Sequence, residues 1–152
     1  MNRPAIVFLM FACTAWAHDE HRDPEYAWGR PGEKAAAART VRVEMDDTLR
    51  YSPARISVRR GETIRFVVHN RGKLPHEMVI GNERELREHA VAMRAHPGMQ
   101  HDEPYMAQVP PGEARELAWT FTNPGTFTFG CLVPGHWEGG MRGVIVVGPK
   151  RE

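Results

Sequence analysis

A segment near the C-terminus, CLVPGHWEGGM at residues 131–141, carries three metal-ligand side chains at intervals of five residues. Cys131 offers a thiolate, His136 an imidazole nitrogen and Met141 a thioether sulfur. The proline and glycines between them disfavour a helix and allow a curled loop in which the three side chains converge. One cysteine, two histidines and a distant methionine are the ligands of a blue-copper site, whereas zinc rarely takes a thioether and calcium or magnesium prefers oxygen.

Such a site needs a second histidine from elsewhere in the chain, and His76 in KLPHEMVIG is the best candidate. It lies where a polar turn meets a predicted strand. Pro75 restricts the backbone just before it, which helps to hold the imidazole in place without metal. His69 in FVVHN lies inside a strand pattern, where we interpret a lone histidine as structural.

The first 17 residues, MNRPAIVFLMFACTAWA, have the features of an export signal: one charge, an apolar run and a small-x-small end. The apolar run is about half as long as a membrane-spanning helix requires. We therefore expect cleavage after Ala17, a periplasmic location and no membrane insertion after cleavage. The alternative is lipoprotein processing at Cys13. Cleavage after Ala17 leaves Cys131 as the single cysteine, which excludes an internal disulfide.

The charge balance disfavours highly charged partners. Removing the export signal takes away one of the 20 basic residues and leaves 19, which equals the 19 acidic residues. Nucleic acids and anionic lipids both favour proteins with a strong positive surplus. We expect neither as a main partner, and the remaining length suits a single domain with a core of its own.

The rest of the chain divides into a polar arm and a β-rich domain. Residues 18–40 are charged, interrupted by proline and glycine and without an apolar period, which predicts a flexible or loosely docked N-terminal arm. Residues 41–152 contain short alternating runs separated by turn signals such as PPG and NPG. We expect strands within 41–45, 55–70, 76–81, 114–122, 125–131 and 141–148. This spacing is typical of an all-β, Greek-key β-sandwich.

One insertion, at about residues 82–106, interrupts the strand pattern. Asn82 and Glu85 have the spacing of a helix N-cap and its capping box. The dipeptide Pro97-Gly98 would end the helix. The insertion therefore predicts one short helix between strands.

The segments YSPARISVRRGETIRFVVHNRGKLPHEMVIG and PGTFTFGCLVPGHWEGGMRGVIVV together resemble the cupredoxins, copper proteins of the plastocyanin and azurin kind. The resemblance covers roughly residues 41–148. It implies a cupredoxin-like β-sandwich with one type 1 copper ion near one end. The implied ligands are His76, Cys131 and His136 in a near-plane, with Met141 as the long axial ligand. His136 would show an edge to solvent and serve as the electron port.

The insertion and the arm carry further histidines and methionines. They are His89, Met93 and His96 at helical spacing, then Met99, His101 and Met106, and in the arm His18 and His21. Two interpretations of the insertion remain open: Leu86, Ala90 and Met93 form the core-facing stripe of the helix, or the histidines and methionines form a second copper site. The arm histidines either chelate copper loosely or belong to a solvated tail. These additions resemble periplasmic copper-tolerance cupredoxins of the CopI type.

Together these features predict a periplasmic type 1 copper-binding protein that acts in copper tolerance and homeostasis and can exchange one electron. Its expected partners are the copper ion and a redox or copper-handling protein. The alternative function is a dedicated electron-transfer shuttle between redox partners. An enzyme is disfavoured, because multicopper oxidases and nitrite reductases hold additional coppers with paired histidines and no His-x-His occurs in the sequence.

Overall fold

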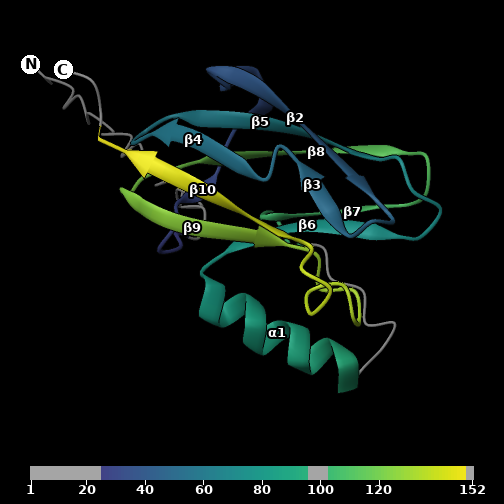
Figure 1. The fold of residues 1–152 in the computed structure, drawn as a ribbon. Coiled ribbons are helices and arrows are strands. Elements are labelled where there is room, and N and C mark those ends of the chain that lie inside the picture. The colour runs from purple at the N-terminus through teal and green to yellow at the C-terminus, as the bar shows by residue number, and fades with distance from the viewer. Residues whose placement is uncertain (1–24, 96–102, 150–152) are drawn as a thin grey trace, which may run out of the picture.

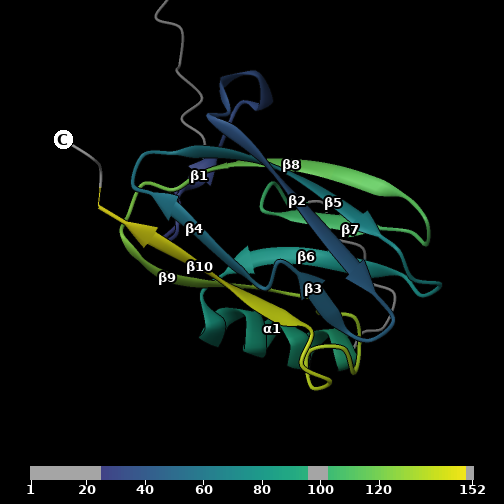
Figure 2. The ribbon, with the colours of Figure 1, turned by 45° about the horizontal axis from the view of Figure 1, so that its top comes forward.

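Two five-stranded sheets face each other in the computed structural model, which describes residues 25–95 and 103–149 (Figures 1 and 2). The sheet orders are β1-β8-β5-β2-β3 and β4-β10-β9-β6-β7. The strands are β1 (Arg30–Pro31), β2 (Arg39–Asp46), β3 (Arg50–Ser52), β4 (Arg55–Arg59), β5 (Thr63–Asn70), β6 (His76–Gly81), β7 (Met106–Val109), β8 (Ala114–Thr120), β9 (Gly125–Gly130) and β10 (Arg142–Gly148). The pairs β2–β5 and β4–β10 are parallel and the other pairs antiparallel. The predicted all-β sandwich with one inserted helix is confirmed.

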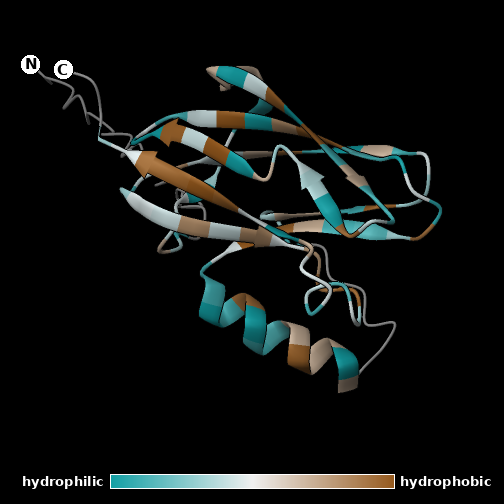
Figure 3. Cartoon of the chain, viewed as in Figure 1, coloured by the Kyte–Doolittle hydropathy of each residue, from teal (hydrophilic) through white to brown (hydrophobic). Residues whose placement is uncertain are grey.

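The core forms because alternate residues of each strand point to opposite faces. In β5, Ile64, Phe66 and Val68 are buried, while the residues between them are partly exposed. In β2, Val43 and Met45 are buried between exposed residues in the same way. Figure 3 shows this alternation as changing colours along the strands. Each sheet thus has one apolar face, and the two apolar faces pack together.

Strand β6 is an exception, since all six of its residues are buried. The helix α1 (Glu83–Ala95) covers the outer face of the second sheet here (Figure 1). Its residues Leu86, Ala90 and Met93 form a second apolar cluster with Val79 of β6. The continuous burial of β6 therefore reflects a strand covered on both faces.

The helix begins where the sequence predicts. The side-chain oxygen Oδ1 of Asn82 accepts the backbone N–H of Arg84 at 2.9 Å, which satisfies one of the free donors of the first turn. Among the described residues, no helix is long and apolar enough to cross a membrane.

Part of the N-terminal arm, residues 18–40, lies against the domain. From residue 25 onward it is docked: β1 pairs with β8, and a single 3-10 turn, η1 (Lys34–Ala36), leads into β2. Trp28 is 7% exposed, and its carbonyl oxygen accepts the indole N–H of Trp119 at 3.1 Å. Tyr26 stacks on Trp28 with ring centroids 5.2 Å apart. These two aromatic side chains anchor an otherwise polar segment, so residues 25–40 follow the docked alternative of the prediction.

Several predictions fall on residues outside the described ranges. They are the export signal at residues 1–17, Cys13, the candidate ligands His18 and His21, and the candidate ligands His96, Met99 and His101. These remain predictions from sequence.

Candidate metal centre

Three strand ends of the second sheet bring the predicted ligands to one end of the sandwich. Strand β6 begins at His76, β9 ends immediately before Cys131, and β10 begins immediately after Met141. Strand β9 pairs antiparallel with both β6 and β10. The start of β6, the end of β9 and the start of β10 therefore lie side by side, although they come from segments far apart in the sequence.

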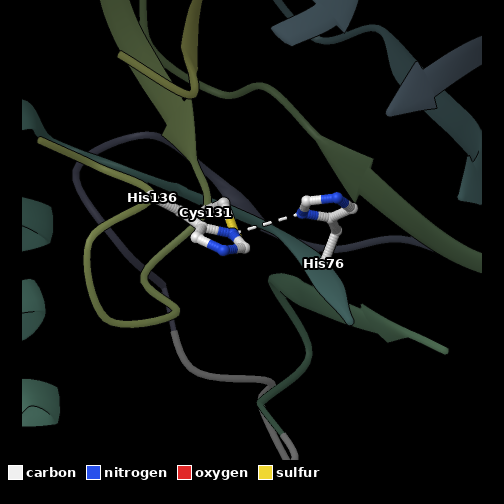
Figure 4. A group of neighbouring side chains, drawn as sticks. All are labelled: His76, Cys131 and His136. Carbon is white, nitrogen blue, oxygen red and sulfur yellow. Dashed lines mark hydrogen bonds between the residues drawn. The ribbon is translucent and has the colours of Figure 1, made fainter. Parts of the chain in front are cut away.

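The ligand atoms of three of these residues converge (Figure 4). Nδ1 of His76 lies 3.2 Å from Nδ1 of His136, and Sγ of Cys131 lies 3.3 Å from the same His136 nitrogen. All three ligand atoms lie within 4.8 Å of one another, close enough to share a single ion. His76 and Cys131 are buried, whereas His136 is partly exposed. In the described part of the chain, this is the one group of three or more His, Cys, Asp or Glu side chains with such spacing.

The ligand loop, residues 131–141, is closed by its own backbone hydrogen bonds. The N–H of Cys131 donates to the carbonyl oxygen of Met141 at 3.1 Å, and the N–H of Met141 donates to that of His136 at 3.0 Å. Gly140 has a φ of 92°, which glycine adopts without the strain that a Cβ would cause. Met141 is fully buried in the same apolar cluster as Cys131. The loop is thus shaped by the chain itself, independently of a metal.

The hydrogen bonding of His76 fits a metal ligand. Its Nε2 lies 3.1 Å from Oδ1 of Asp47. An ionised carboxylate can only accept a hydrogen bond, so Nε2 carries the proton and Nδ1 keeps its lone pair. That lone pair is on the ring nitrogen that faces His136. Two imidazole nitrogens, a thiol sulfur and a buried thioether suit copper, and they lack the oxygen donors that hard cations require.

Burial determines the protonation of the other two ligands. Burial, followed by the negative charge of Glu77, raises the pKa of the Cys131 thiol to about 12. Burial also lowers the pKa of His136, and the neighbouring Asp47 carboxylate only partly offsets this effect. At neutral pH the metal-free site therefore holds a thiol and a neutral His136, and a bound cation must displace the thiol proton.

Two carboxylates that the sequence did not single out brace the ligands. Glu77 is 5% exposed, and its Oε1 accepts the backbone N–H of Leu132 at 2.8 Å, which ties β6 to the ligand loop. Asp47, in the turn between β2 and β3, accepts from His76 as described above. A charge inside the apolar run HEMVIG was an available signal for Glu77. The sequence MDDT gives no such signal for Asp47, because its role depends on where the turn lies in the folded chain.

The inserted helix supports the ligand loop from the outer face of the sheet. Leu132 and Trp137 of the ligand loop pack in one cluster with Leu86, Ala90 and Met93 of α1. The guanidinium of Arg142 lies 5.6 Å from the centre of the Trp137 ring. This packing confirms that Leu86, Ala90 and Met93 are the core-facing stripe of the helix.

The accessory histidines and methionines are only partly within the described residues. Met106 begins β7 and packs at the border of the α1 cluster, and His89 is partly buried on the helix. His69 lies on β5 opposite Ala114 of β8, outside the ligand group. The second copper site therefore stays a prediction.

A double-sheet sandwich with two histidines and a cysteine gathered at one end defines the class of cupredoxins. The chain matches the copper-binding proteins of the plastocyanin/azurin family over residues 37–148. It belongs to that family, copper is the metal of the site, and His76, Cys131, His136 and Met141 are positioned as a type 1 copper site.

Individual relatives extend the similarity beyond this domain. A copper-resistant cuproprotein CopI of Rubrivivax gelatinosus is 48% identical over 158 residues, covering 95% of this chain and 96% of the relative. The protein of the same name from Pseudomonas aeruginosa is 32% identical over 173 residues, covering 95% and 93%. Among solved structures, dithionite-reduced auracyanin from Roseiflexus castenholzii matches with a TM-score of 0.64 at 27% identity, covering 74% of this chain and 99% of that one. The chain is therefore a copper-binding cupredoxin related to the CopI proteins.

Proposed function

We propose that this protein is an exported, periplasmic cupredoxin that binds one copper ion and acts in copper tolerance, with one-electron redox capability. The observation that carries the proposal is the convergence of the His76, Cys131 and His136 ligand atoms within 4.8 Å of one another. The two relatives named copper-resistant cuproproteins, matched over nearly their full length, support the tolerance role. The export signal predicted at residues 1–17 supports the location.

Each ligand has a definite part in holding copper. His76 and His136 supply neutral imidazole nitrogens, Cys131 supplies a thiolate after losing its proton, and Met141 supplies a weak thioether contact. When bound, copper supplies a Cu(II)/Cu(I) couple. The backbone hydrogen bonds that close the ligand loop, together with its packing against α1, keep the ligands nearly fixed in both oxidation states. Since the thiolate, both imidazoles and the thioether are all assigned to the ion, we propose binding and electron exchange and no catalysis.

One observation favours the alternative function of a dedicated electron shuttle. His136 is the one proposed ligand that is partly exposed, and its neighbour His76 lines an apolar groove together with Pro75, Val109, Pro110, Val133 and Pro134. A partly exposed ligand close to an apolar surface suits brief contact with a redox partner.

Growth in copper distinguishes the two functions. A strain that lacks the gene is grown over a range of copper concentrations and complemented with the wild-type chain or with Cys131→Ser. The tolerance role predicts that gene loss lowers the copper concentration that stops growth, and that only the wild-type chain restores it. Unchanged growth without the gene, together with binding of a single copper equivalent, would favour the shuttle.

A further inference from the structure

We propose that Asp47 is a positioning residue of the copper site, which fixes the tautomer of His76 and favours Cu(II) over Cu(I). This inference rests on the proposed copper function. It starts from the hydrogen bond between Oδ1 of Asp47 and Nε2 of His76 at 3.1 Å. A carboxylate on the far nitrogen of a metal-binding imidazole orients the ring and raises its basicity.

Asp47 is itself held in place by the segment that leads into β6. Its Oδ2 accepts the backbone N–H of Lys73 at 2.8 Å, and its Oδ1 accepts that of Leu74 at 3.1 Å. Gly72 passes so close that a Cβ there would lie 2.0 Å from Oδ1 of Asp47. The approach therefore depends on glycine, and the carboxylate has little freedom to move away from His76.

The same segment is fixed from its other side by Asn70, which is fully buried. Its Nδ2 donates to the carbonyl oxygens of Leu74 at 2.7 Å and Val109 at 2.9 Å, and its Oδ1 accepts the N–H of Gly72 at 2.8 Å. Asp47 and Asn70 thus hold residues 70–75 between them. These hydrogen bonds fix the segment that leads into His76.

The charge of Asp47 gives the contact a functional consequence. The two backbone N–H groups of Lys73 and Leu74 donate to the carboxylate of Asp47 and stabilise its ionised form. A fixed negative charge on the far side of one imidazole ring stabilises the more positive ion, Cu(II), more than Cu(I). The carboxylate of Asp47 is 36% exposed, so water weakens this preference without abolishing it.

Two substitutions separate position from charge, and a neighbouring residue supplies the control. Asp47→Asn keeps one acceptor oxygen and removes the charge, whereas Asp47→Ala removes both. Asp46→Asn removes a charge one residue away, from a carboxylate whose Oδ1 accepts the N–H of Thr48 within the same turn at 2.9 Å. All three variants are compared with the wild-type full chain.

The first measurement uses metal-free protein and long-range ¹H–¹⁵N NMR of the imidazole of His76. We expect the Nε2–H tautomer in the wild type and in Asp46→Asn, and a mixture of tautomers in Asp47→Ala. A wild-type protein with the proton on Nδ1 would overturn the inference. Because no copper is present, this result is independent of the proposed function.

The second measurement is the equilibrium between the Cu(II) and Cu(I) forms against a redox mediator. Asp47→Asn should shift the ratio of Cu(I) to Cu(II) about tenfold towards Cu(I), which is 59 mV for a one-electron couple. Asp46→Asn should shift this ratio much less. Asp47→Ala should also weaken Cu(II) binding by about 10–100-fold. Equal shifts in Asp47→Asn and Asp46→Asn, or no shift in either, would overturn the charge role. If Asp47→Ala does not fold, the redox equilibrium of Asp47→Asn and the tautomer of His76 in the wild type test the inference. A wild-type protein that does not bind copper would contradict the proposed function and leave the tautomer result standing.

Discussion

Replacement of Glu77 by alanine should destabilise the metal-free protein and loosen the ligand loop. Glu77 is 5% exposed and Leu132 is 2% exposed, so the hydrogen bond between them lies away from water. Without the acceptor, the N–H of Leu132 stays buried and unpaired. The penalty for such a group is about 1–3 kcal/mol, a large share of the 5–15 kcal/mol by which a typical domain is stable.

Urea unfolding of the metal-free protein, followed by tryptophan fluorescence, measures this loss directly. Three of the four tryptophans, Trp28, Trp119 and Trp137, are buried and report on unfolding. The urea concentration at the midpoint of unfolding should fall in Glu77→Ala. The slope of the unfolding free energy against urea should stay the same, because the folded and unfolded states are as compact as before. Glu77→Gln is the matched control, because its amide oxygen can still accept from Leu132.

The two variants together test the reasoning. Glu77→Gln should keep most of the stability that Glu77→Ala loses, and Glu77→Ala should also bind copper more weakly because the ligand loop is no longer tied to β6. Equal stability of Glu77→Ala and wild type would show that this hydrogen bond does not brace the site. Equal losses in both variants would assign the effect to the charge and not to the bond.

Three further outcomes are expected. Met141→Leu should retain coloured copper but raise its reduction potential, since the axial sulfur tunes the couple; an unchanged potential in voltammetry would contradict the axial assignment. Trp28→Ala should lower the free energy of unfolding by about 3–5 kcal/mol, and a loss near zero in urea unfolding would show that the arm is not docked. Burial raises the pKa of the Cys131 thiol to about 12. As pH rises, the unfolded chain loses the thiol proton at a lower pH than the folded protein does. The free energy of unfolding should therefore fall as pH rises from about 9 towards 12. Cys131→Ser should show a shallower decline in the same pH titration of unfolding, and identical slopes would refute a buried neutral thiol.

Much of the fold follows from short-range pattern. The alternation of TIRFVVHN predicts β5, and Asn82 before a helical segment predicts the start of α1, because both depend on residues close in sequence. The ligand types also follow from sequence, since few metals combine a thiolate, imidazoles and a thioether. What joins them is the pairing of β9 with β6 and β10, which is seen in the strand register and not in the local sequence.

The features that sequence missed all depend on contacts between distant segments. Trp28 is anchored by Trp119, which lies 91 residues away in the chain, so composition alone did not separate a flexible arm from a docked one. Asp47 and His76 are 29 residues apart, and nothing local shows that the turn between β2 and β3 lies over the site. Glu77 and Leu132 are 55 residues apart, and only the register of β6 with β9 places them together.

The most direct test of copper binding by these four residues is a titration of the purified protein, without its export signal, with Cu(II) while the visible spectrum is recorded. We predict an intense thiolate-to-copper charge-transfer absorption that saturates at one copper per type 1 site and is absent in Cys131→Ser. Copper binding without that absorption, or the same absorption in Cys131→Ser, would contradict the assignment of Cys131 and, with it, the site.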